Sequence, residues 1–148
     1  MSLPGRPNGR SGWIAQRATI AKSTPWHIVV DLRARRVTVY HAGRSVRVVR
    51  AVVGEPATPT PVGHFFVQET IKLGPLAVGA PDALALSARS TVLRHFEGGV
   101  GQIGLHGILN VGGVLGTAGS HGCVRLSTKM MRWLALRMGP GTPVTITT

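Results

Sequence analysis

Apolar and polar residues alternate regularly between positions 26 and 48. Residues 26–32 and 37–40 follow this two-residue period, and a turn over 41–44 that contains Gly43 separates them from a further run at 45–48. Because side chains along a strand point alternately to the two faces of a sheet, the pattern predicts a β-hairpin with one apolar and one basic face.

A proline-rich stretch and another strand follow the hairpin. Residues 54–63 contain three prolines, which lack backbone N–H donors and therefore predict a loop. Residues 64–71 predict the next strand. Residues 74–81 are irregular, and the short apolar pieces over 83–93 do not favour any one element.

A short strand and a glycine-rich segment come next. Residues 101–105 predict a brief buried strand that ends at His106. Residues 107–119 contain five glycines and predict a long flexible loop.

The last part of the chain predicts one helix and one strand. Ser127 or Thr128 can cap the helix, and residues 139–140, a Gly-Pro pair, stop it. Its apolar residues form one broad face and are Met130, Met131, Trp133, Leu134, Leu136 and Met138. β-branched residues over 142–148 suit a final strand.

The composition agrees with one mostly β domain. The chain has 148 residues, and a typical domain has about 100–150. Its 43% hydrophobic residues are enough for a core and exclude wholesale disorder, while 20 Gly and 10 Pro favour many short strands. We expect residues 1–25 to be an N-terminal extension or linker and residues 26–148 to form the domain.

The charge points to an anionic partner. Seventeen Lys and Arg against five Asp and Glu give a formal net charge of +12, which must lie on the surface. A nucleic-acid-binding module is therefore an alternative. It is the weaker one, because zinc-finger spacing, a helix-turn-helix signature and RNP-like aromatic motifs are all missing from the sequence.

The sequence contains no recognisable membrane or export segment. No apolar run approaches the roughly 18 residues that a membrane-spanning helix needs. Residues 1–12 are polar and rich in Gly and Pro, unlike a signal peptide. Two interpretations stay open: a cytoplasmic protein, or the mature or excised domain of a longer exported chain.

The candidate chemistry centres on Cys123. It is the only cysteine and so has no intramolecular disulfide partner, which leaves it the chemistry of a thiol. It ends the glycine-rich segment, 17 positions after His106, and a loop of this length can return to its start at modest entropic cost. A neighbouring imidazolium lowers the pKa of a thiol from about 8.5 and so favours the nucleophilic thiolate. Gly122 allows successive N–H groups to converge on an oxyanion.

Other roles for these residues are possible. His121 could act as the base in place of His106. A metal site of His106, His121 and Cys123 is a remote option, because it lacks a convincing fourth ligand. Arg125 suits contact with a buried carbonyl or the loop backbone as well as it suits a substrate carboxylate.

The pattern resembles the catalytic domain of the bacterial L,D-transpeptidases over about residues 26–148. The resemblance rests on the His-Gly pair at 106–107, the connecting loop, and Ser-His-Gly-Cys-Val-Arg-Leu at 120–126. Residues 58–65 are similar to the family's upstream Thr-Pro-x-Gly-x-Phe segment. Some members carry Asn two residues after the cysteine, and Arg125 resembles the other common variant.

The resemblance implies a mostly β, sandwich-like fold with one helix after the cysteine, in an enzyme of the cell envelope. Its substrates would be peptidoglycan stem peptides, with anionic cell-wall polymers as possible further partners. Cys123 would expel the terminal D-Ala, hold the stem as a thioester and pass it to an amine to form a 3→3 cross-link. This pathway needs no metal and no cofactor, and it implies sensitivity to carbapenems. With water as acceptor, the enzyme would be a carboxypeptidase.

The resemblance also implies individual roles. His106 would be the base, oriented by the backbone carbonyl of Gly107. The amides of Gly122 and Cys123 would form the oxyanion pocket, and Ser120 and His121 would support the loop. A flap over the site is expected within residues 74–94.

Overall fold

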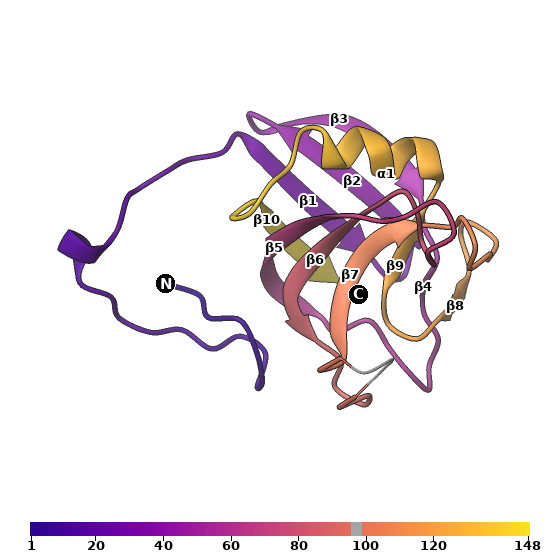
Figure 1. Ribbon diagram of the computed structural model, residues 1–148, viewed down its shortest axis with the longest axis horizontal. Coiled ribbons are helices and arrows are strands. Elements are labelled where there is room, and N and C mark those ends of the chain that lie inside the picture. The colour runs from indigo at the N-terminus through magenta and orange to yellow at the C-terminus, as the bar shows by residue number, and fades with distance from the viewer. Residues whose placement is uncertain (96–98) are drawn as a thin grey trace.

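β-Strands make up most of the regular secondary structure of the protein, as the alternating pattern predicts (Figure 1). The computed structural model describes residues 1–95 and 99–148. The first half contains the 3-10 helix η1 (Gln16–Ala18), β1 (Trp26–Asp31), β2 (Arg36–His41), β3 (Arg44–Arg50), β4 (Val53–Gly54) and β5 (Gly63–Lys72). The second half contains β6 (Asp82–Arg89), β7 (Gln102–Gly107), β8 (Ala118–Ser120), β9 (Val124–Leu126), α1 (Thr128–Ala135) and β10 (Pro143–Thr147).

Eight of these strands form one sheet in the order β3-β2-β1-β10-β5-β6-β7-β9, and β4 and β8 form a separate parallel pair. Neighbours in the large sheet are antiparallel except β1 with β10 and β7 with β9. The last strand of the chain thus lies in the middle of the sheet. It connects the N-terminal hairpin to the four strands that carry the candidate chemistry.

A single hydrophobic core is enclosed by the curved sheet and the helix. It includes Ile28 of β1, Leu84 of β6 and Leu105 of β7, all with no exposed surface. Figure 1 shows the β1–β3 half crossing behind the β5–β9 half, which gives the sandwich-like arrangement that the resemblance predicts. Burial of apolar surface from both halves is the main stabilising contribution to such a fold.

Helix α1 closes one side of this core. The Ser127 side chain caps it by accepting the Met130 N–H at 3.2 Å, which decides between the two predicted caps. Met131 and Leu134 are buried, whereas Leu136, expected on the same face, follows the helix and is 70% exposed. No helix in the described part of the chain is long and apolar enough to cross a membrane.

The predicted hairpin is confirmed, with one difference in β3. A bulge next to Tyr40 breaks the pairing register between β2 and β3. Val46 and Val49 consequently pack against the core, while Val48 is 54% exposed. A bulge shifts the two-residue period by one position, so the alternation in sequence does not continue onto a single face.

Strand β6 is the longest element that the sequence did not predict. Seven of its eight residues are buried because it lies between β5 and β7 with both faces covered. A strand covered on both faces has no polar alternation to reveal it. Its position also corrects the range of the predicted flap, since residues 82–89 form a strand inside the sheet, and of these only Ala83 lines the pocket described below.

Candidate active site

Parallel pairing of β7 with β9 brings His106 and Cys123 to the same region. Leu105 pairs with Val124 and His106 with Arg125, so Cys123 lies just before β9, beside the middle of β7. Parallel neighbours need a crossover of about a dozen residues or more. The glycine-rich segment is this crossover, and its last residues form β8. Sequence reasoning placed the cysteine next to the helix, whereas β9 lies between them.

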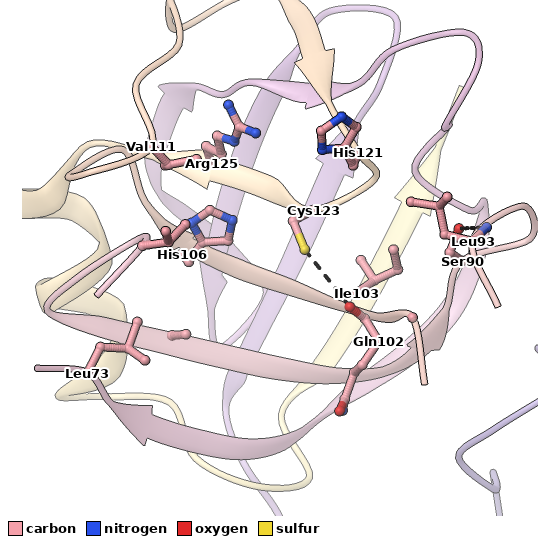
Figure 2. Close-up of a pocket in the computed structure, with 13 residues that line it drawn as sticks. Leu73, Ser90, Leu93, Gln102, Ile103, His106, Val111, His121, Cys123 and Arg125 are labelled. Atoms are coloured by element: carbon pink, nitrogen blue, oxygen red, sulfur yellow. Dashed lines mark hydrogen bonds between the residues drawn. The ribbon is translucent and has the colours of Figure 1, made fainter. Parts of the chain in front are cut away.

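Backbone groups of β7 contact the sulfur of Cys123. The Gly104 N–H donates to Sγ at 3.4 Å, and Sγ lies 4.0 Å from the carbonyl oxygen of Gln102 (Figure 2). The residue is half-buried at the edge of a pocket, not enclosed in the apolar core. Its thiol is therefore accessible, and a backbone N–H that donates to the sulfur favours the thiolate.

The His106 ring is oriented by backbone. Its Nδ1 lies 2.8 Å from the carbonyl oxygen of Gly107, the contact that the resemblance predicts. Since a carbonyl oxygen only accepts, Nδ1 carries the hydrogen, and Nε2 of the neutral ring is left as the basic nitrogen.

Gly79 packs tightly against this ring. A Cβ at Gly79 would lie 2.4 Å from Nδ1 of His106, and the residue has a φ of +78°. The Gly107 N–H also donates to the Gly79 carbonyl at 2.9 Å. Both the close approach and the positive φ require glycine at position 79, a restraint on His106 that sequence reasoning missed.

The loop before the nucleophile is held by Ser120. Its buried Oγ donates to the Cys123 carbonyl at 2.5 Å and accepts the Gly122 N–H at 3.2 Å. Ser120 thus has the supporting contacts that were expected of it. The Gly122 N–H already donates to Ser120 Oγ. It could stabilise an oxyanion only by breaking or sharing this hydrogen bond. Gly122 itself has a φ of +113°, which favours glycine.

A second brace comes from the proline-rich loop before β5. Thr60 is 3% exposed, and its Oγ1 donates to the Gly122 carbonyl at 2.8 Å and accepts the Gly54 N–H at 2.9 Å. Thr58 Oγ1 donates to the Ser120 carbonyl at 3.2 Å. The sequence predicted a loop here but not this contact, because the contact joins residues 62 positions apart.

Replacing Thr60 by valine should loosen this brace. The change leaves a buried N–H and a buried C=O without their partner, so we expect a loss of about 1–3 kcal/mol in the free energy of unfolding. Urea unfolding of Thr60→Val and Thr60→Ser measures it, and the serine variant should retain most of the stability because it keeps the hydroxyl. Equal stability of the valine variant and the wild type would contradict this role.

The pocket around Cys123 has a volume of about 550 Å³. Figure 2 shows His106, His121 and Arg125 around it together with the cysteine. None of its described lining residues is acidic, so it favours an anionic ligand. Its apolar walls come from both sides of β6 and from β7 and the crossover: Leu73, Val78, Leu93, Ile103 and Val111.

Arg125 and His121 lie at the open side of the pocket. The Arg125 guanidinium reaches the Gly112 carbonyl at 3.4 Å, and its Nε is buried without a hydrogen-bond partner among the described residues. His121 is an exposed residue. Across residues 1–95 and 99–148, no group of three or more His, Cys, Asp or Glu side chains is arranged to hold a metal ion.

Comparison with known proteins points to one family. The sequence model of the L,D-transpeptidase catalytic domain, YkuD, matches residues 25–146. A Bacillus licheniformis relative that bears the name L,D-transpeptidase YkuD is 31% identical over 123 residues, covering 83% of this chain and 66% of the relative. Among solved structures, an L,D-transpeptidase from Mycobacterium smegmatis is 25% identical with a TM-score of 0.61, covering 84% of this chain and 59% of that one.

The L,D-transpeptidase LdtMt1 in complex with imipenem has the same fold. It is 24% identical with a TM-score of 0.58, and the match covers 83% of this chain and 59% of that one. The chain therefore spans less than two thirds of the length of each of these three proteins.

Proposed function

Because this chain belongs to the L,D-transpeptidase catalytic-domain family, we propose that it is a cysteine acyltransferase of the cell envelope that acts on peptidoglycan stem peptides. The observation that carries the proposal is the β7–β9 pairing, which lines one pocket with a half-buried thiol and an oriented imidazole. Residues 26–148 would form the catalytic domain, and residues 1–25 an extension before it.

In the first half-reaction, the thiol of Cys123 loses its proton to Nε2 of His106. Sγ then attacks the carbonyl carbon that joins the third residue of the stem to the terminal D-Ala, and an S–C bond forms. The amide N–H of Cys123 would stabilise the oxyanion. The C–N bond breaks, the leaving amine takes the proton from His106, and the stem remains as a thioester.

In the second half-reaction, an amine of a neighbouring stem attacks the thioester. His106 takes a proton from this amine, the S–C bond breaks, and the thiolate of Cys123 is regenerated as the new amide forms. The product is a 3→3 cross-link. If water attacks instead, the product is a free tripeptide and the enzyme is a carboxypeptidase.

The electrostatics of the pocket favour such a donor. Stem peptides carry carboxylates, and Arg125 lines the pocket together with Cys123. The net charge of +12 would also concentrate anionic wall polymers near the surface. Since LdtMt1 holds imipenem, we propose that carbapenems acylate Cys123 here as well.

Product analysis tests the proposed reaction. The purified protein is incubated with a disaccharide-tetrapeptide, and the products are identified by mass spectrometry. We expect D-Ala and a cross-linked dimer in equal amounts, because each transfer expels one D-Ala. Tripeptide with D-Ala but no dimer would favour the carboxypeptidase instead. Absence of D-Ala release would contradict both reactions.

A further inference from the structure

Residues 5–8 of the N-terminal extension dock against one end of β6. The Gly5 N–H lies 3.5 Å from the Ser87 carbonyl. The Asn8 side chain makes two bonds to the backbone of Arg89: Nδ2 donates to its carbonyl at 2.8 Å, and Oδ1 accepts its N–H at 2.9 Å. An asparagine amide has both a donor and an acceptor, so it can take the place of a neighbouring strand.

This end of β6 lies beyond the last residue pair of the β5–β6 ladder. In the described ladder, the pairing of β5 with β6 ends at Val67 and Leu86, and the next N–H of β5, that of Phe66, donates to Ser87 Oγ at 3.1 Å. Beyond that point the backbone of β6 needs other partners on this side. Residues 5–8, which we call the strap, supply them.

Arg6 of the strap forms hydrogen bonds with both ends of the segment that connects β6 to β7. Its Nη1 donates to the Val100 carbonyl at 2.8 Å and its Nη2 to the Leu93 carbonyl at 2.8 Å. Nε and Nη2 also donate to the Ser90 carbonyl, at 3.2 and 3.1 Å. One planar guanidinium thus joins three carbonyls, which a lysine ammonium does not do in the same fixed geometry.

Hydrogen bonds rather than charge attraction hold the strap. Burial, and secondarily the nearby Arg6 guanidinium, lowers the pKa of Arg89. The two cations therefore repel each other. The contacts of Arg6 with the connection are all to neutral backbone carbonyls, so salt should weaken this docking little.

The segment between β6 and β7 that Arg6 contacts forms one wall of the pocket. Ser90, Leu93 and Gly101 line it, and the Ser90 N–H donates to the Gly101 carbonyl at 2.8 Å. The next residue, Gln102, has its carbonyl 4.0 Å from Cys123 Sγ. The Val100 carbonyl that Arg6 reaches is therefore two residues from a group that contacts the nucleophile.

We infer that Arg6 and Asn8 are positioning residues whose docking fixes this wall and so sets the affinity of the pocket for the donor stem. The inference concerns the same pocket as the proposed function, and the identity of the donor stem rests on that function. The strap contacts neither the thiol nor the imidazole in the described hydrogen bonds, so its loss should change binding of the donor more than the chemistry of Cys123.

Hydrogen exchange tests whether the strap holds the wall. In Arg6→Ala/Asn8→Ala, amides in residues 89–95 and 99–103 should exchange about tenfold faster than in the wild type, because local opening becomes easier. Arg6→Lys keeps the charge but not the planar fork, and should show the same direction of change. Arg17→Ala removes an equal charge from the same extension and should match the wild type. Exchange in the double variant equal to that in Arg17→Ala would overturn the inference.

Kinetics test the effect on the donor. The double variant should raise KM for the disaccharide-tetrapeptide about tenfold and leave kcat within about threefold, the signature of lost ground-state binding. Alkylation of Cys123 by iodoacetamide should keep its rate. A lower kcat with unchanged KM would also overturn the inference. If the wild type releases no D-Ala, the proposed function fails, while the exchange experiment still decides whether the strap orders the wall.

Discussion

Replacing Cys123 by alanine is expected to abolish covalent adduct formation. On incubation with imipenem, the wild type should gain the mass of one drug molecule, and Cys123→Ala should gain none. Release of D-Ala from a disaccharide-tetrapeptide should fall by at least about a thousandfold, because the variant lacks the thiol that is proposed to form the acyl intermediate. Intact-mass spectrometry and D-Ala quantification measure the two effects.

The control for this experiment is the fold of the variant. Alanine at position 123 removes one half-buried sulfur that accepts a backbone N–H from Gly104 at 3.4 Å. We therefore expect a circular dichroism spectrum like that of the wild type and a small change in melting temperature. An adduct of the same mass on a folded Cys123→Ala protein would place the nucleophile elsewhere and contradict the proposed function.

Replacing His106 by alanine is expected to lower the rate of acylation by about a hundredfold to ten-thousandfold, the usual contribution of a general base. The structure gives the reason: the Gly107 carbonyl accepts from Nδ1 at 2.8 Å, so Nε2 is the nitrogen that would take the thiol proton. Stopped-flow acylation by a carbapenem measures the effect. Raising the pH should recover part of the lost rate, since hydroxide then forms the thiolate without a base.

The matched control is His121→Ala. His121 lines the same pocket but is an exposed residue of the loop before the cysteine. We expect its loss to slow acylation less than about tenfold, an effect on loop position and not on proton transfer. The opposite ranking, with normal acylation by His106→Ala and a large loss in His121→Ala, would assign the base to His121.

The elements that the sequence predicts well are those exposed on one face. Strands β1 and β2 and helix α1 alternate between core and solvent, so their periods are visible in the sequence and their existence is confirmed. Strand β6 is buried on both faces and β9 has three residues, so neither produces a readable period. The range predicted for the flap included β6 for the same reason.

The sequence by itself determined which residues are candidates for chemistry. A single cysteine in a Ser-His-Gly-Cys segment, with a His-Gly pair 17 positions before it, was enough to select Cys123 and His106. These features are visible in the sequence because each is a short run of neighbouring residues, His106-Gly107 and Ser120 to Cys123.

The tertiary structure decided what holds these candidates in place. Thr60 braces the cysteine loop from 62 positions away, Gly79 packs against His106 from another loop, and Arg6 reaches Val100 across 94 positions. None of these pairs has a local pattern, because each depends on the order of strands in the sheet. Only a folded chain brings such distant backbone groups within hydrogen-bonding distance, and so only the fold shows which residues support the site.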